Sequence, residues 1–373
     1  MNLSFVNLIL LIAAFHGAVL ASIILLSKRF DHRGKVFLTM LIFVMSILVA
    51  RNELEEIQLI QKYIVIYILS WGLPIFIGPL LYLYIRKLIV GKTSLRKHLI
   101  VPLLYYTFLA YGLLNGITTD EAVVSKPMIL NFYLAFQLFI VLQLPYYLYR
   151  SWQLIRAYQS DIRNHYSNLN KISLRWLLYI VSATSILYLI WMIVYGGDVI
   201  LFDGVVPLPD VNIVTFMFAL LIFSIGYLTM LRPELFQVTL QRLKNSPNSL
   251  ITFNEEDAVA FKSKIEEALN RQCVYLNQKL TVNDLAESIN LSPKITSQLI
   301  NKIYKISFYD LINTYRLEEV KKNLLDQKNK HLTIEGIALN SGFNSSSTFN
   351  RLFKVHTGQT PKAFRSSAFS KII

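Results

Sequence analysis

The sequence has very little of the chemistry that disulfide-stabilised folds and most metal sites require. Cys273 is the single cysteine, which excludes a disulfide within the chain, and the six histidines are scattered without a close cysteine or histidine partner. The signatures HExxH, GxGxxG and GxSxG are also absent. We therefore expect no metal, no cofactor and no catalytic residues.

Charged residues are scarce and unevenly distributed. They make up 16% of the chain, against about 25% in an ordinary soluble domain, while 54% of the residues are hydrophobic. Residues 1–231 contain 17 Lys and Arg with 10 Asp and Glu, whereas the shorter part 232–373 contains 20 and 13. This contrast predicts a membrane-embedded first part followed by a soluble domain.

Seven stretches of the first part contain no Asp, Glu, Lys or Arg. They are Met1–Ser27, Val36–Ala50, Tyr63–Ile85, Leu99–Thr119, Pro127–Tyr149, Trp176–Gly197 and Val211–Leu231. A helix of about 20 residues crosses the hydrocarbon core, so all but the second stretch are long enough. The second can instead be a re-entrant or interfacial segment. The first has no Lys or Arg before its apolar run, which favours a retained span over a signal peptide.

The basic residues between these stretches alternate along the chain. Connections one, three and five hold 14 Lys and Arg, whereas connections two, four and six hold three. Because basic loops stay on the cytoplasmic side, seven spans with the N-terminus outside and the C-terminus inside are predicted. For a sensory site we favour the outer half of this bundle, near Asn115, Asn131 and the acidic connection Gly196–Asp210.

The second part begins with a linker, Lys244–Ser249, and an amphipathic helix within Glu255–Arg271. This helix can pack either on the following domain or on a second copy of itself, as in a homodimer. The sequence does not decide between the two.

An internal repeat follows from Lys279. Thr281-Val282-x-x-Leu285-Ala286 recurs as Thr333-Ile334-x-x-Ile337-Ala338, 52 residues later. In each unit Thr is a helix N-cap, and Asn290 or Gly342 is a residue type that ends a helix in the left-handed conformation. A second helix then starts after Ser292 in one unit and after Asn344 or Ser345 in the other. Two helices joined by a tight turn are typical of a helix-turn-helix.

The second helix of each unit is predicted to present polar and basic side chains to DNA. Asn and Gln can bind adenine, Arg can bind guanine, and Ser can contact bases or phosphates. Residues 279–365 contain 13 Lys and Arg against 7 Asp and Glu, which suits phosphate contact. The expected DNA-binding residues are Lys294, Ser297, Gln298, Asn301, Lys302, Ser345, Ser346, Ser347, Asn350, Arg351 and Lys354.

Residues 279–365 resemble the DNA-binding domain of the AraC/XylS family of bacterial transcription regulators, most closely in GFNSSSTFNRLFKVHTGQTPKAFR at 342–365. The resemblance implies two helix-turn-helix units joined by a long helix over about Phe308–Leu325. Two positions of the first unit depart from the family pattern: Lys305 replaces the usual Gly, and Thr296 replaces a larger apolar residue. The whole arrangement is similar to a membrane-bound subset of the family, whose membrane half is taken to be sensory.

These observations predict an all-α protein with a seven-helix transmembrane bundle (1–231), a cytoplasmic linker with an amphipathic helix (232–278) and an AraC-type double helix-turn-helix domain (279–373). The expected function is a non-enzymatic regulator in the bacterial cytoplasmic membrane that couples a membrane or extracytoplasmic signal to gene expression. The alternative is a transporter or membrane enzyme with an accessory DNA-binding domain. The expected partners are double-stranded DNA, the lipid bilayer and an unidentified signal molecule, with a second copy of the chain and RNA polymerase as further candidates.

Overall fold

The computed structural model describes residues 4–30, 34–56, 63–70, 72–114, 127–170, 172–201, 210–231 and 255–369. Within these residues the secondary structure is helical, apart from one isolated antiparallel bridge between Tyr166 and Thr281. The expected all-α class is therefore confirmed. The chain forms two compact units, one of residues 1–157 and 174–243 and the other of residues 158–173 and 244–373.

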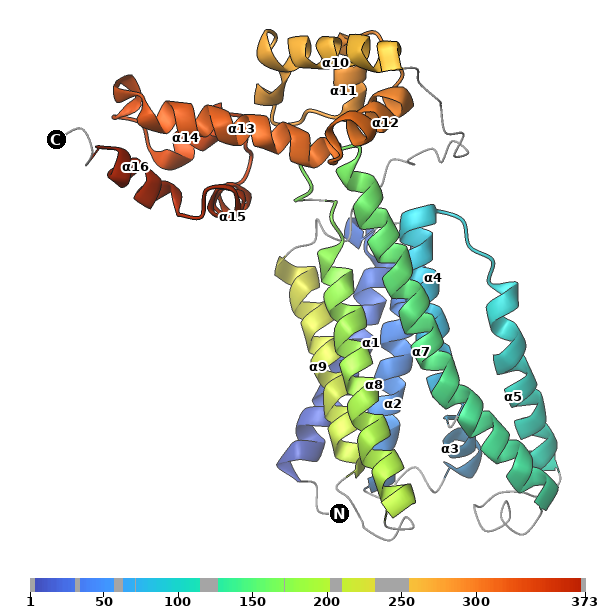
Figure 1. The fold of residues 1–373 in the computed structure, drawn as a ribbon. Helices are drawn as coiled ribbons and strands as arrows, with labels where there is room; N and C mark the ends of the chain where they lie inside the picture. The colour runs from blue at the N-terminus through green and yellow to red at the C-terminus, as the bar shows by residue number, and fades with distance from the viewer. Residues whose placement is uncertain are drawn as a thin grey trace. The chain divides into compact units, whose positions relative to one another are not determined.

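The first unit consists of helices, most of them long (Figure 1). They are α1 (Phe5–Leu26), α2 (Lys35–Glu56), α3 (Ile64–Ser70), α4 (Ile77–Val90), α5 (Arg96–Leu114), α7 (Pro127–Arg163, of which residues 158–163 belong to the second unit), α8 (Arg175–Leu201) and α9 (Asp210–Leu231). Each expected stretch is thus at least partly helical. The third is broken into α3, a 3-10 turn at Leu73–Phe76 and α4, because Gly72 and Pro74 interrupt it.

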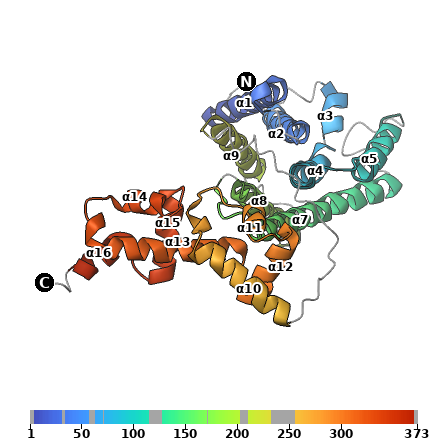
Figure 2. The same cartoon turned by 90° about the horizontal axis from the view of Figure 1, so that it is seen from above.

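Helices α1, α2 and α9 pack closely side by side (Figures 1 and 2). Gly17 permits this approach, since a Cβ atom at this position would lie 2.2 Å from Ser46 Oγ and 2.9 Å from Ile222 Cγ2. Small residues at helix crossings let backbones come together in membrane proteins, where dispersion contacts replace the hydrophobic effect between helices. The contact therefore suits helices that pack within lipid.

Polar side chains add cross-links at one end of this helix group. Asn7 Nδ2 donates to Glu53 Oε2 over 2.9 Å, and Asn52 Nδ2 donates to Thr215 Oγ1 over 2.9 Å. Helix α2 has 22 residues, so it extends well past the 15-residue charge-free stretch from which it was predicted. Its extra turns carry the Asn and Glu that make these hydrogen bonds.

Many large apolar side chains of the first unit are exposed. Phe5, Phe15, Leu26, Tyr179 and Ile193 each leave more than 70% of their surface uncovered. Within the described residues, three helical segments are long and apolar enough to cross a membrane, namely Phe5–Leu26, Lys35–Glu55 and Leu73–Val90. Shorter apolar segments lie in α8, at Arg175–Ile190, and in α9, at Thr215–Leu228. The full set of seven spans stays a prediction.

The second unit contains α10 (Glu255–Asn270), α11 (Val282–Ser288), α12 (Pro293–Tyr304), α13 (Phe308–Leu325), α14 (Ile334–Asn340), α15 (Ser346–Thr357) and α16 (Pro361–Phe369). Ile265, Ala268 and Leu269 of α10 are buried in the same hydrophobic cluster as α11 and α12. The amphipathic helix therefore packs on the following helices. This packing is one of the two arrangements that its sequence left open.

Candidate nucleic-acid interface

The first helix-turn-helix is formed by α11 and α12. Thr281 caps α11 by accepting a hydrogen bond from the Asp284 backbone N–H, and the Asp284 carboxylate accepts in return from the Thr281 N–H over 2.7 Å. Asn290 takes the left-handed conformation, with φ of 55°, and the Leu291 N–H then donates to the Ala286 carbonyl over 2.8 Å. Ser292 caps α12, whose first residue is proline. The expected caps and turn are confirmed.

The second helix-turn-helix, formed by α14 and α15, repeats this construction. Thr333 caps α14 through the Gly336 N–H at 2.9 Å, Gly342 has φ of 92°, and the Phe343 N–H donates to the Ala338 carbonyl over 3.0 Å. Ser345 caps α15. The two turns thus share one hydrogen-bond pattern, as the sequence repeat predicted.

Helix α13 joins the two helix-turn-helix motifs and matches its predicted bounds. Its first half places Phe308, Leu311 and Ile312 in the core of the first motif. Its second half places Leu317, Val320 and Leu324 in the core of the second motif. Because one continuous helix of 18 residues contributes to both cores, it sets the spacing between α12 and α15.

The expected DNA-binding residues differ in how far they are exposed. Asn301, Lys302, Ser347, Asn350, Arg351 and Lys354 are exposed, Lys294, Gln298, Ser345 and Ser346 are partly buried, and Ser297 is buried. Helix α15 has the clearest face, since Ser347, Asn350, Arg351 and Lys354 follow the spacing of one helix side. This face combines groups that can contact bases with a basic residue near the helix end.

Helix α12 departs from the predicted pattern at Ser297. The spacing predicted an outward side chain, but Ser297 is 8% exposed and its hydroxyl donates to the Asn164 carbonyl over 3.3 Å. The neighbouring Gln298 Oε1 is buried and accepts no hydrogen bond among the described residues. A segment far away in the sequence therefore contacts this helix at Ser297.

That segment, residues 158–173, contributes polar contacts that sequence reasoning missed. The Ser167 hydroxyl donates to the Leu280 carbonyl over 2.6 Å, and Arg163 forms an ion pair with Asp310 at 2.7 Å. The sequence identified these residues merely as part of a basic connection between two apolar stretches. No spacing signal relates them to the helix-turn-helix domain more than 100 residues later.

Arg316 of α13 is the most deeply buried cation of the site. It is 2% exposed, and burial lowers its pKa to about 10. Its Nε donates to the Tyr275 carbonyl over 2.8 Å and its Nη2 to the Asn277 carbonyl over 2.7 Å. These bonds fix the chain that leads into α11, so this arginine is structural and was not among the predicted DNA contacts.

Within the described residues, no group of three or more His, Cys, Asp or Glu side chains is placed to hold a metal ion. The polar chemistry of the second unit is instead that of hydroxyl, amide and basic side chains on helices. Such groups suit hydrogen bonding to base edges and phosphates.

Comparisons with known proteins point to the same region. Residues 285–367 match a family of helix-turn-helix domains. A helix-turn-helix-type transcriptional regulator of Staphylococcus aureus (strain COL) is 29% identical over 114 residues, which are 31% of this chain and 15% of that protein. The raffinose operon transcriptional regulatory protein RafR of Pediococcus pentosaceus is 30% identical over 122 residues, 32% of this chain and 43% of that protein. No solved structure shows significant similarity.

The C-terminal part of the chain is therefore a helix-turn-helix domain of the AraC type. The chain spans less than half the length of the curated relatives described above, and the similarity is confined to about a third of this chain.

Proposed function

We propose that this protein is a membrane-tethered transcription regulator that binds DNA through α12 and α15. One observation carries the proposal: two helix-turn-helix units with the same caps and turns share the linking helix α13. A shared helix holds two second helices at a defined spacing, which suits two contacts along one duplex. The names of the relatives, which are transcriptional regulators, agree with this function.

Within this proposal α15 reads the sequence and also positions the domain. Asn350 and Arg351 have the side chains for bidentate contact with adenine and guanine. Lys354, in the last turn of α15, is placed for a phosphate. The remaining contacts would come from Lys294, Gln298, Asn301 and Lys302 of α12 and from Ser345, Ser346 and Ser347 at the start of α15.

We also propose that the first unit spans the cytoplasmic membrane with its N-terminus outside. The many exposed apolar side chains of α1 and α8 support this, since such side chains are stabilised by an apolar environment. The alternating distribution of basic residues supports the orientation. The second unit would then lie in the cytoplasm, where it can meet DNA and RNA polymerase.

Coupling to a signal completes the proposal. A ligand shifts a protein between two states when its affinity for them differs, so the first unit would need a site that changes shape. We place this site near Asn115, Asn131 and Gly196–Asp210. Asn115 and residues 202–209 lie outside the described residues, and Asn131 is described by its backbone alone.

A chromatin-binding profile of the intact protein tests the proposed function. We expect enrichment at a small set of chromosomal sites that share a sequence motif. A protein carrying both Asn350→Ala and Arg351→Ala should lose this enrichment while remaining in the membrane at normal abundance. A profile without discrete sites, or one that the double substitution leaves unchanged, would contradict DNA recognition by α15.

A further inference from the structure

Residues 158–173, which we call the strap, comprise the end of α7 and most of its connection to α8, and they belong to the second unit. The structure describes all of them except residue 171. Ile162 is 1% exposed, Ser167 2% and Leu169 8%, so both apolar and polar strap side chains are buried. The strap is thus packed as part of the helix-turn-helix domain while it is covalently continuous with apolar helices on both sides.

The strap pairs with the backbone that leads into α11. The Ser167 N–H donates to the Leu280 carbonyl over 3.3 Å, and the Val282 N–H donates to the His165 carbonyl over 2.9 Å. Tyr166 and Thr281 therefore face each other as the non-hydrogen-bonded pair of an antiparallel bridge. This pairing gives the strap a defined register.

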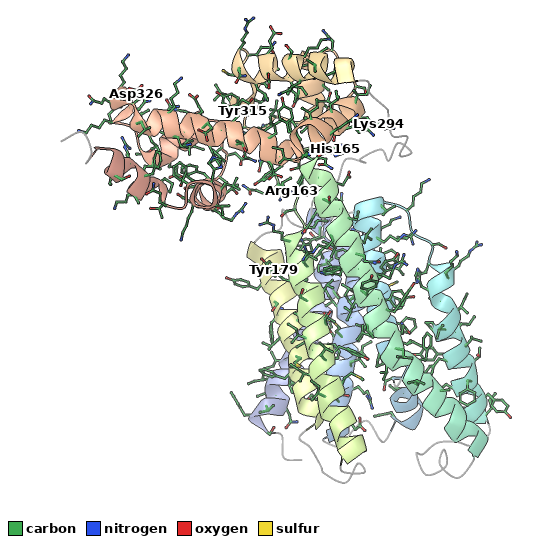
Figure 3. The ribbon with its side chains drawn as sticks, viewed as in Figure 1. Arg163, His165, Tyr179, Lys294, Tyr315 and Asp326 are labelled. Carbon is green, nitrogen blue, oxygen red and sulfur yellow. The ribbon has the colours of Figure 1, made fainter. Side chains whose placement is uncertain are left out.

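Side chains attach the strap to α13 as well. Arg163 Nη2 lies 2.7 and 2.9 Å from the two carboxylate oxygens of Asp310, and its guanidinium lies 5.1 Å from the centre of the Tyr309 ring. The Ser167 carbonyl accepts from Asn313 and Arg316, each over 3.4 Å. Figure 3 shows Arg163 and His165 at the junction of the strap with this domain.

The strap also contacts both helices that we propose to read DNA. The Asn164 carbonyl accepts from Ser297 of α12, and Asn170 Oδ1 accepts from Thr348 of α15 over 2.8 Å. The major groove is about 12 Å wide and admits one helix. A strap backbone at hydrogen-bonding distance from Ser297 therefore competes with DNA for the same side of α12.

We propose that the strap is an autoinhibitory element. When docked, it prevents α12 from entering the major groove, and its release makes the domain competent to bind DNA. The inference rests on the proposed DNA-binding function. It assigns the α7–α8 connection, rather than the linker 232–254 alone, as a route from the first unit to the recognition helices.

The docked contacts suit a reversible switch. Beside the buried apolar side chains of Ile162 and Leu169, they include several hydrogen bonds and an ion pair between Arg163 and Asp310. The side chains of this pair are 41% and 37% exposed, and ion pairs of that exposure are weak in water. A ligand that favours one arrangement of the helices on either side can therefore shift the balance between docked and released strap.

A disulfide lock tests the inference in the full-length protein in lipid nanodiscs. Residues that form a non-hydrogen-bonded antiparallel pair have Cα atoms about 4.5 Å apart, within the range that a disulfide spans. Tyr166→Cys and Thr281→Cys would be combined with Cys273→Ser, which removes the single native cysteine. The probe is a duplex enriched from a random-sequence library by the same protein in its reduced form.

We expect the oxidised protein to bind this duplex about tenfold more weakly or worse than the reduced protein, because the competent state is no longer populated. Equal or tighter binding in the oxidised form would overturn the inference, as would failure of the two cysteines to join. If no duplex is enriched by this protein or by the Arg163→Ala protein, the proposed DNA-binding function itself fails.

A single substitution gives an independent test without cysteines. Arg163→Ala removes the ion pair with Asp310, so we expect DNA binding to tighten by about two- to fivefold. Arg156→Ala on α7 removes the same charge from an exposed residue that lies over Trp152, and it should leave the affinity unchanged. Weaker binding by the Arg163→Ala protein would show that Arg163 supports DNA binding and would overturn autoinhibition.

Discussion

The guanidinium of Arg316 donates to the Asn277 carbonyl oxygen over 2.7 Å and so ties the middle of α13 to the chain ahead of α11. Burial lowers the pKa of Arg316 to about 10, which still leaves it charged at neutral pH. The folded state binds this proton less tightly than the unfolded chain. The buried charge therefore costs stability at neutral pH, and this cost is relieved only as the pH rises above about 10. Several carbonyl acceptors offset that cost.

The first prediction concerns this arginine. Arg316→Leu should reduce the free energy of opening of α13 by roughly 2–5 kcal/mol, because it leaves the Tyr275 and Asn277 carbonyls without their donor. Arg316→Lys should reduce this free energy by less, since an ammonium group can replace some of the hydrogen bonds that the guanidinium donates. Hydrogen exchange of α13 amides in the full-length protein measures both effects. A Leu variant as protected as the native protein would contradict this role.

The second prediction compares two glycines with positive φ. At Gly342 a Cβ atom would lie 2.4 Å from the Tyr275 carbonyl oxygen and 2.8 Å from Arg316 Nε, whereas at Gly358 nothing lies within 4 Å. Gly342→Ala should therefore lower the free energy of opening of α14 and α15 by about 3 kcal/mol or more, through both backbone strain and steric clash. Gly358→Ala should lower it by about 1–2 kcal/mol through strain alone. Exchange of the α14 and α15 amides reports the difference. Equal losses would show that the clash is relieved by local movement.

The third prediction concerns membrane topology. A reporter fused after Gly197 should be active only outside the cytoplasm, and one fused after Lys92 should behave as cytoplasmic, because basic residues gather in the odd connections. Fusions after Gly116 and Tyr158 should repeat this contrast. A cytoplasmic signal from the Gly197 fusion would contradict the prediction of seven spans. The assignment of the helix-turn-helix domain does not depend on this result.

Much of the second unit could be predicted because the sequence signals for its helix caps and turns are local. A cap at Thr281 or Thr333 depends on residues within one helical turn, and the left-handed turn at Gly342 depends on the residue type itself. Even Lys305, which stands where related domains have glycine, adopts the left-handed conformation, with φ of 55°. The repeat made these local signals stronger by showing them twice.

The strap could not be predicted because its contacts are long-range and mostly involve backbone atoms. The hydrogen bond from Ser297 to the Asn164 carbonyl joins positions 133 residues apart. Every residue has a backbone carbonyl, so the residue type at position 164 does not indicate this contact. Helical spacing assigns Ser297 to the outer face but cannot show that another segment covers it. For the same reason the burial of Arg316 was missed, since its acceptors are largely main-chain carbonyls.

The last prediction separates base reading from phosphate contact on α15. Arg351 and Lys354 are both exposed and three positions apart, so their substitution by Ala removes one charge each from the same helix face. Arg351→Ala should cost about 1–3 kcal/mol of specific binding and relax the preference at one base pair. Lys354→Ala should weaken binding to all sequences alike and lower the salt slope by about one. Binding of the full-length variants to the enriched duplex and to a scrambled duplex, over a series of salt concentrations, distinguishes these effects. If both variants lose affinity equally for the two duplexes, Arg351 contacts the backbone, and the specificity of α15 must then come from Asn350 or the serines at its start.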